Sequence, residues 1–244
     1  MVDITVIILT KNEEKNLKKC IESFRGIARR FVIVDSFSTD RTEELCHKLN
    51  IELNEIGSCL DFYQNKWSSY ADQFNWGLTN TDISTEWAMR FDSDEELTEE
   101  LAIEIETKLS ILREPINGII LRRRIYFMGR WIKHGGRYPE LLLRIFRTGK
   151  AYCEKKLMDE HMILLEGTTF IFEHDLIDNN QKDLEWWIAK HNWYSDREVY
   201  DYQMIFKNQV NDKLEKYGES SRQAKMKRII KNRGYYKLPQ FFRA

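Results

Sequence analysis

The chain has 244 residues, of which 42% are hydrophobic and 32% are charged, the balance of a soluble globular protein. Its 38 basic and 39 acidic residues leave a net charge of -1, so no global field drives binding to nucleic acid, and no nucleic-acid partner is expected. The four cysteines form no CxxC pair, and a disulfide framework or cysteine zinc site is therefore not expected. The start of the chain has neither a signal-peptide pattern nor the roughly 20 apolar residues of a spanning helix, which favours a cytoplasmic protein.

The first hundred residues alternate between strand and helix patterns. Apolar, β-branched runs predict buried strands, and each run is followed by polar, cap-forming residues and then by apolar residues at helical spacing. Successive strand–loop–helix units predict a parallel sheet with right-handed crossovers. The strands are expected at residues 4–9, 31–34, 51–56 (a strand or its edge) and 87–91, and the helices at residues 17–24, 42–49 and 67–78.

The remaining sequence predicts a helix at residues 99–112, followed by strands at 118–127, 141–146 and 169–172. Residues 128–139 contain three glycines and predict a loop. From Asp183 onward the pattern is helical, and the tail becomes basic and aromatic. That tail has two interpretations, a contact with anionic lipid headgroups or an ordinary solvated helix face.

Asp92 and Asp94 form an Asp-x-Asp pair directly after the apolar run that ends at Phe91. Two carboxylates one residue apart repel each other, and a cation between them makes them tolerable in a partly buried site. Hard oxygen ligands suit Mg²⁺ or Mn²⁺, which keep open positions for phosphate oxygens. The alternative is a solvated acidic helix start. The strand in front of the pair and the polar loops upstream favour the metal site.

Two polar loops, at residues 10–13 and 35–40, follow the first two predicted strands. In parallel sheets ligands bind beyond the carboxyl ends of the strands, which is where these loops are expected. Asp35 can accept a hydrogen bond from a nucleobase N–H or a ribose hydroxyl. Residues 38–40 are favoured as capping and turn residues, and loop 10–13 can either bind a ligand or cap the next helix.

Taken together, these motifs resemble the family 2 glycosyltransferases of the GT-A fold, and most of all their lipopolysaccharide-core β-1,4-glucosyltransferase-like branch. Each motif is modest alone, but their order and spacing over about residues 3 to 200 are specific. The matching segments are LTKNEE (9–14), VDSFSTDRT (34–42), QFN (73–75), DSDE (92–95), GRW (129–131), GGRYP (135–139) and LRIFR (143–147).

The resemblance implies an α/β fold of the GT-A (Rossmann-like) type, with a mostly parallel central sheet flanked by helices and a helical C-terminal segment. It implies a catalytic domain at residues 1–180 that binds nucleotide-sugar and acceptor, and a helical, basic and aromatic extension at 181–244. Asp92 would contact the ribose and the metal, and Asp94 would bind the metal, Mn²⁺ or Mg²⁺, directly. The residues implied to line the nucleotide pocket are Thr10, Asn12, Glu13, Asp35, Gln73 and Asp92.

On the acceptor side, the resemblance implies a carboxylate that removes the proton from the attacking hydroxyl. Glu160 falls on the family's glutamate, while Asp159 replaces the histidine that usually precedes it, so both acids are candidates for the base. A surface acidic pair is the alternative. His174 follows an apolar strand, and some relatives use a late histidine as a metal ligand, although a lone histidine is more often structural.

The function implied is inverting, metal-dependent transfer of a sugar from a nucleotide-diphosphate sugar, with UDP favoured, to a hydroxyl of a bacterial surface glycan such as lipopolysaccharide or capsule. The acceptor would be a glycan or lipid-linked glycan, with peripheral contact on the inner face of the membrane through the tail. A sugar nucleotidyltransferase is the alternative enzyme, but the loop at residues 10–13 lacks that class's glycine-rich basic signature. A non-catalytic glycan-binding scaffold of the same fold is the third interpretation.

Overall fold

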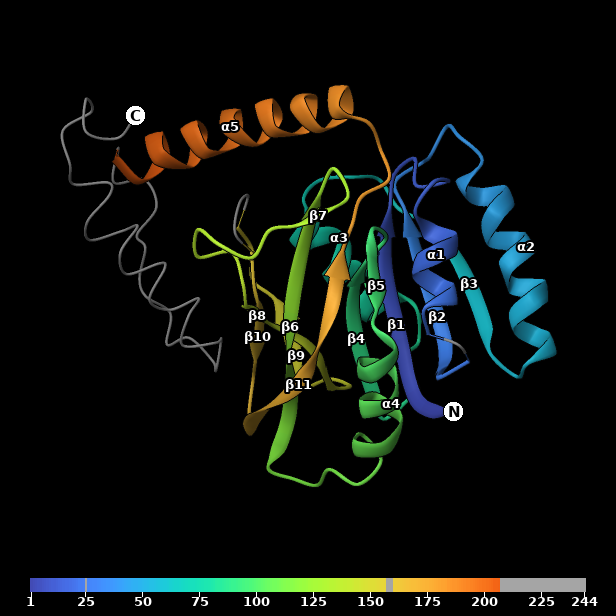
Figure 1. The fold of residues 1–244 in the computed structure, drawn as a ribbon. Helices are drawn as coiled ribbons and strands as arrows, with labels where there is room; N and C mark the ends of the chain where they lie inside the picture. Colours follow the sequence, from blue (N-terminus) through green and yellow to red (C-terminus); the bar gives the residue numbers. More distant parts are fainter. Residues whose placement is uncertain (25, 157–159, 207–244) are drawn as a thin grey trace.

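Nine strands form one hydrogen-bonded sheet in the computed structural model, which describes residues 1–24, 26–156 and 160–206 (Figure 1). Eight of them lie side by side in the order β3-β2-β1-β4-β8-β6-β11-β5, and β7 pairs with β6 off this path. The strands are β1 (Val2–Thr10), β2 (Ala28–Asp35), β3 (Cys59–Gln64), β4 (Trp87–Asp92), β5 (Glu95–Leu97), β6 (Ile116–Phe127), β7 (Arg130–Trp131), β8 (Glu140–Arg147) and β11 (Thr168–Asp178).

The half of the sheet built from β1 to β4 is parallel, as the alternating pattern predicts. β1 lies between β2 and β4 and is buried along most of its length, which explains its nearly continuous run of apolar side chains. In the other half, β8 runs antiparallel to both β4 and β6, and β11 is parallel to β6. The predicted α/β architecture is confirmed, with β8 inserted between its two parallel parts.

Helices cover both faces of the sheet. On one face lie α1 (Leu17–Glu22), α2 (Thr42–Glu55) and α4 (Glu99–Lys108), whose buried side chains share one core cluster with β1, β2 and β4. On the other face lie α3 (Tyr70–Asn80) and the small antiparallel pair of β9 (Ala151–Cys153) and β10 (Met162–Leu164), which share a second cluster. The sheet is therefore the middle layer between two apolar cores.

The predicted strand at residues 51–56 is wrong, because α2 continues to Glu55. Cys46, Leu49 and Leu53 are buried at helical spacing, so the helix buries one continuous face against the sheet. The strand comes later, as β3, whose inward side chains are only partly apolar. The short strands β5, β7, β9 and β10 were not predicted from the sequence. Strands this short depend more on the strands with which they pair than on their own side chains.

The helical pattern predicted from Asp183 is confirmed as α5 (Leu184–Phe206). Figure 1 shows that α5 crosses the end of the sheet at which β1 ends. None of the helices in the described ranges is both long and apolar enough to span a membrane. Residues 207–244, which include the basic aromatic tail, lie outside the described residues.

Thr98, which precedes the first turn of α4, connects that helix to the sheet. Thr98 Oγ1 accepts a hydrogen bond from the Leu101 N–H at 3.2 Å and donates one to the Asp175 carbonyl of β11 at 2.9 Å. We expect Thr98→Ala to lower the free energy of unfolding by about 1 kcal/mol, the usual cost of losing a helix cap. Thr98→Ser keeps the oxygen and is the control. Equal stability of the two variants in urea unfolding would contradict this role.

Candidate active site

Three of the sequence-predicted site residues lie together at the carboxyl edge of the parallel strands. Thr10 of β1 is in register with Asp35 of β2, and Leu9 is in register with Asp92 of β4. Thr10, Asp35 and Asp92 are therefore the last residues of three adjacent strands. This is the edge at which doubly wound sheets bind ligands.

Asp35 is fully buried and already hydrogen-bonded within the chain. One carboxylate oxygen accepts from the Thr10 hydroxyl at 2.8 Å and from the Ser38 hydroxyl at 2.5 Å, and the other accepts from the Ser38 N–H at 2.7 Å. Asp35 thus fixes the shape of the loop that follows β2. Its proposed contact with a nucleotide would use the remaining capacity of the second oxygen.

The loop after β1 is bonded to the loop after β2 through Asn12. Its backbone has a φ of 57°, its N–H donates to the Ser38 Oγ at 2.8 Å, and its Oδ1 accepts from the Thr39 N–H at 2.8 Å. Gln73 of α3 joins the same edge from the other side, because its amide donates to the Ser36 Oγ at 3.0 Å and to the Asn65 carbonyl at 3.1 Å. Both residues shape the walls of the predicted nucleotide pocket.

Glu13 is buried and paired with Lys182, whose Nζ lies 2.5 Å from its Oε1. Asn16 donates to the other oxygen at 2.7 Å. Burial raises the pKa of Glu13 above its ordinary value, although Lys182 opposes that shift. The segment that leads into α5 is therefore attached directly to the loop after β1.

The Asp92–Asp94 turn is shaped by a buried glutamate. Glu95 is fully buried, and its Oε2 accepts from the Asp92 N–H at 3.0 Å. Arg144 of β8 donates to Glu95 at 2.5 Å and to the Asp92 carboxylate at 3.0 Å. Loss of solvent alone would raise the pKa of Asp92, but the Arg144 and Arg90 cations outweigh it and hold that pKa below its ordinary value.

Two further carboxyl groups lie behind this turn. Glu95 is in register with Asp178 of β11, and Arg123 of β6 lies 3.6 Å from the former and 3.4 Å from the latter. Burial raises the pKa of both carboxyl groups, with Arg144 opposing at Glu95 and Arg123 opposing at Asp178. Both of these carboxyl groups lie behind the turn, whereas Asp92 and Asp94 are only partly buried.

Asp94 contacts the segment that precedes α5. Its Oδ2 accepts from the Asn180 side-chain amide at 2.7 Å, and its carbonyl accepts from the Asn179 N–H at 3.0 Å. From α5 itself, Lys190 faces this charge. Loss of solvent would lower the pKa of Lys190, but the Asp94 carboxylate raises it above its ordinary value. Lys190 of the helix therefore interacts electrostatically with the acidic turn.

Glu160 lies at the same edge through an arginine of β4. Arg90 donates to Glu160 at 3.0 Å, and its Nε lies 3.9 Å from the Asp92 carboxylate. Only 12% of the Glu160 side chain is exposed, so it is not part of a solvated surface pair. Asp159, the other candidate base, lies outside the described residues.

His174 is placed apart from this set. Its Nδ1 lies 2.9 Å from the Glu104 carboxylate of α4, which also accepts from the backbone N–H groups of Glu173 and His174. In this position His174 and Glu104 hold the irregular part of β11 against α4. The residue of this region that reaches Asp94 is Asn180, and the metal role of His174 stays a prediction.

Sequence reasoning missed three of the residues that build the site, namely Glu95, Arg144 and Arg90. The available signal was a charged residue inside an apolar run, since Arg144 stands between Leu143 and Ile145 and Arg90 between Met89 and Phe91. A charge in a buried strand requires a partner, because an unpaired buried charge is strongly unfavourable.

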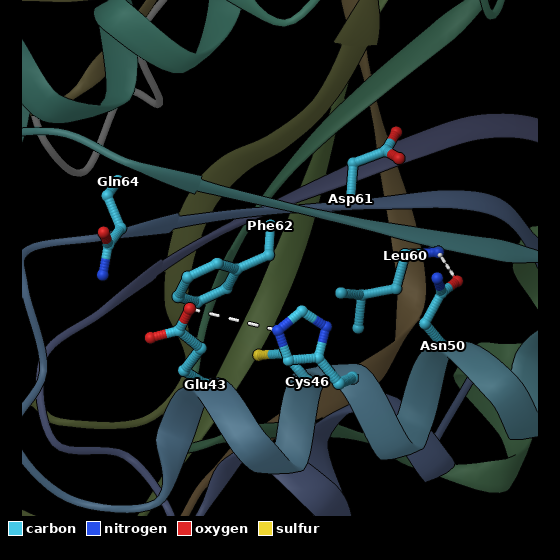
Figure 2. A pocket seen from close by; sticks show the side chains of 8 residues that line it. Glu43, Cys46, Asn50, Leu60, Asp61, Phe62 and Gln64 are labelled. Carbon is cyan, nitrogen blue, oxygen red and sulfur yellow. Dashed lines mark hydrogen bonds and ion pairs between the residues drawn. The ribbon is translucent and has the colours of Figure 1, made fainter.

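A cavity of about 450 Å³ opens between α2 and β3, at the β3 end of the sheet. Figure 2 shows Glu43 and Cys46 reaching toward it from the helix, and Phe62 and Gln64 from the strand. None of the sequence-predicted site residues lines it. Burial raises the pKa of Cys46 to about 12, so the thiol there is protonated and unreactive.

A comparison with protein families shows to which family the chain belongs. The sequence model of the family described as "Glycosyl transferase family 2" matches residues 5–171, more than half of the chain. The chain belongs to glycosyl transferase family 2. The matched span contains every sequence-predicted site residue except His174.

Relatives of family 2 agree with this assignment. The chain is 33% identical over 164 residues to the lipopolysaccharide core biosynthesis glycosyltransferase LpsC of Rhizobium meliloti, which covers 67% of this chain and 58% of that protein. It is 32% identical over 103 residues to an uncharacterized glycosyltransferase of Rickettsia bellii, covering 42% of this chain and 31% of that protein. The chain thus spans less than two thirds of the length of these relatives.

Among solved structures, the fold is similar to S. aureus TarS 1–349. The likeness has a TM-score of 0.53 and 16% identity to TarS in complex with UDP-GlcNAc, over 75% of this chain and 60% of that one. A second structure of the same protein gives a TM-score of 0.51 at 15% identity, over 73% of this chain and 60% of that one. Together with the family match, this confirms the predicted GT-A fold.

The Arg144–Glu95 pair allows a direct test of what holds the acidic turn. Arg144→Met leaves the Glu95 charge buried without its closest partner, and we expect unfolding to be easier by about 3 kcal/mol or more. The double variant Arg144→Met/Glu95→Gln removes that charge and should recover part of the loss, as measured by urea unfolding. A double variant less stable than the single one would show that the ion pair is not what stabilises the turn.

Proposed function

We propose that the protein is an inverting, metal-dependent glycosyltransferase that moves a sugar from a UDP-sugar to a hydroxyl of a bacterial surface glycan such as lipopolysaccharide or capsule. The observation that carries this proposal is the Asp92–Asp94 turn at the carboxyl edge of the sheet, with Asp35 on one side and Glu160 on the other. Donor-binding and proton-accepting groups are thereby available at one edge.

The donor class rests on family membership and on the names of the similar proteins. TarS is described in complex with UDP-GlcNAc, and we carry uridine diphosphate over to this chain as a proposal. Thr10, Asn12 and Asp35 would bind the nucleoside, with Glu13 and Gln73 fixing the loops around it. The name of the Rhizobium relative supports a lipopolysaccharide core or similar glycan as the acceptor.

The donor set of the acidic turn fits a hard divalent cation. Among the described residues no three His, Cys, Asp or Glu side chains are grouped closely enough to hold a metal by themselves. Asp92 is held by Arg144, which leaves Asp94 as the direct ligand and Asp92 as a ligand through water. Mn²⁺ or Mg²⁺ commonly combines one or two carboxylates with substrate phosphates, and would neutralise the charge of the departing diphosphate.

Two residues of the chain have separate proposed roles in the transfer step. Lys190, beside the acidic turn, is positioned to add a second positive charge near the diphosphate. Glu160 would accept the proton of the attacking hydroxyl while Arg90 keeps its carboxylate oriented. Attack opposite the departing diphosphate inverts the anomeric centre without a covalent intermediate.

We place this reaction in the cytoplasm, where nucleotide-sugar donors would reach the edge of the sheet. A lipid-linked glycan acceptor would bring the protein to the inner face of the membrane, with the basic tail as a peripheral contact. The residues of that tail, Lys225 to Arg233, lie outside the described residues.

Removing the direct metal ligand tests the metal-dependent mechanism. We expect Asp94→Asn to lower hydrolysis of a UDP-sugar in Mn²⁺ by at least about 10²-fold, because the diphosphate loses charge stabilisation worth several kcal/mol. UDP affinity, measured by calorimetry in Mn²⁺, should fall as well. Asp61→Asn, on β3, is the control. Full activity of the wild-type protein in EDTA would contradict the metal-dependent mechanism.

Glu160→Gln tests the base. The amide keeps the shape of the carboxylate but cannot accept a proton, so we expect kcat for transfer to fall by about 10²- to 10⁴-fold, while UDP affinity stays nearly unchanged. Glu55→Gln, at the exposed end of α2, is the control. If Asp159→Asn loses activity instead, Asp159 is the base, and if both variants keep it, the base lies elsewhere.

A further inference from the structure

The loop between β6 and β8 carries several basic side chains near the edge of the sheet. Residues 128–139 contain Arg130, Lys133, His134 and Arg137 but no acidic residue. All four side chains belong to exposed residues. A positively charged loop beside an acidic site can bind an anionic group, while the acidic site itself binds a cation.

The arginines of the neighbouring strands behave differently, because each has a carboxylate partner within 4.0 Å. The pairs are Arg90–Glu160, Arg122–Asp175, Arg123–Glu140, Arg124–Asp175, Arg144–Glu95 and Arg147–Glu86. Within the part of the chain that the structure describes, Arg130, Lys133 and Arg137 have no such partner. Their charges are available to a ligand.

Contacts at both ends hold this basic loop at the edge of the sheet that carries the candidate active site. β7 pairs with the end of β6, where Phe127 is in register with Arg130. The Phe127 ring lies 5.0 Å from the Trp187 ring of α5, the helix that crosses the same edge. At the other end of the loop, Glu140 is bonded to Arg123, which also faces Glu95 behind the acidic turn. Figure 1 shows the loop beside β7, beneath α5.

An aromatic pair supports the basic side chains. Trp131 and Tyr138 lie edge to face with ring centroids 4.9 Å apart, and Lys133 lies over the Trp131 ring at 4.6 Å. The Tyr138 hydroxyl donates to Asp175 at 3.0 Å, which fixes the pair to β11. The Trp131 ring thus holds the Lys133 ammonium group by a cation–π contact.

The two glycines at the tip of the loop leave room for a ligand. Gly135 and Gly136 both have a φ of 72°, a backbone conformation that residues with a Cβ rarely adopt. A Cβ at either position would meet no atom within 4 Å. The tip of the loop at Gly135 and Gly136 therefore lies in open space.

We propose that the acceptor glycan is anionic, and that Arg130, Lys133 and Arg137 bind a phosphate group close to the hydroxyl that receives the sugar. This rests on the proposed function, and it names the chemical class of the acceptor. Arg130 and Arg137 can bind phosphate or carboxylate oxygens in a bidentate manner, and Lys133 adds a point charge. The loop thereby selects the acceptor by charge, while the acidic turn holds the donor.

The test compares one oligosaccharide in two charge states. The probes are the phosphorylated core oligosaccharide released from lipopolysaccharide by deacylation and the same oligosaccharide after chemical removal of its phosphates. Binding to the protein saturated with UDP and Mn²⁺ is measured by calorimetry. We expect the phosphorylated form to bind at least about tenfold more tightly, since charge-assisted hydrogen bonds contribute that much each.

The variant Arg130→Gln/Lys133→Gln/Arg137→Gln should abolish the difference between the two probes while UDP-sugar hydrolysis stays at the wild-type rate. The control variant Lys18→Gln/Arg29→Gln/Lys48→Gln removes the same charge from exposed side chains on α1, α2 and β2, and should keep the difference. Equal binding of both probes to the wild-type protein would overturn the proposal, as would an equal loss in the control variant.

Two further outcomes are distinguishable. If the loop variant loses co-sedimentation with vesicles containing phosphatidylglycerol but still prefers the phosphorylated probe, the loop binds a lipid surface and the proposal is wrong. If the wild-type protein hydrolyses no UDP-sugar, the proposed function fails separately, whatever the oligosaccharide binding shows.

Discussion

The buried ion pair between Arg144 and Glu95 is the interaction on which the geometry of the site depends. Glu95 accepts the Asp92 N–H and so bends the chain into the Asp-x-Asp turn, and Arg144 neutralises Glu95 and holds the Asp92 carboxylate. Because one arginine bonds to both acids, β4, β5 and β8 are held in one arrangement. Because the turn is fixed in this way, Asp94 lies at the carboxyl edge of the sheet, where it is a candidate metal ligand.

The same principle organises the rest of the edge. Charges placed in buried strands are paired across elements, so that Arg90 connects β4 to Glu160 and Arg123 connects β6 to β8 and β11. The N-terminal loops are fixed instead by hydrogen bonds that the Asp35 carboxylate accepts from uncharged hydroxyl and N–H groups. Groups proposed to bind the nucleotide are therefore held by local loop geometry, and groups proposed to act on the sugars by long-range ion pairs.

This division explains how much could be predicted from the sequence. The parallel strands and the helices depend on local patterns, and these were predicted except at residues 51–56, where an amphipathic helix continues, and at β3, which begins only at Cys59. The roles of Glu95 and Arg144 could not be read, because they depend on which strands become neighbours. β8 lies next to β4 although a long stretch of chain separates them, and no periodicity in either strand indicates that pairing.

The insertion of β8 between β4 and β6 also has an evolutionary consequence. The ends of the basic loop are also fixed by contacts outside it: the Phe127 ring contacts Trp187 of α5, and Glu140 is in register with Arg123 and bonded to it. Substitutions confined to the exposed tip of the loop, residues 133–137, are therefore not expected to move these two ends. On the acceptor role proposed for this loop, lineages can acquire a new acceptor preference by remodelling one short, exposed segment, while the residues of the acidic turn are inherited intact.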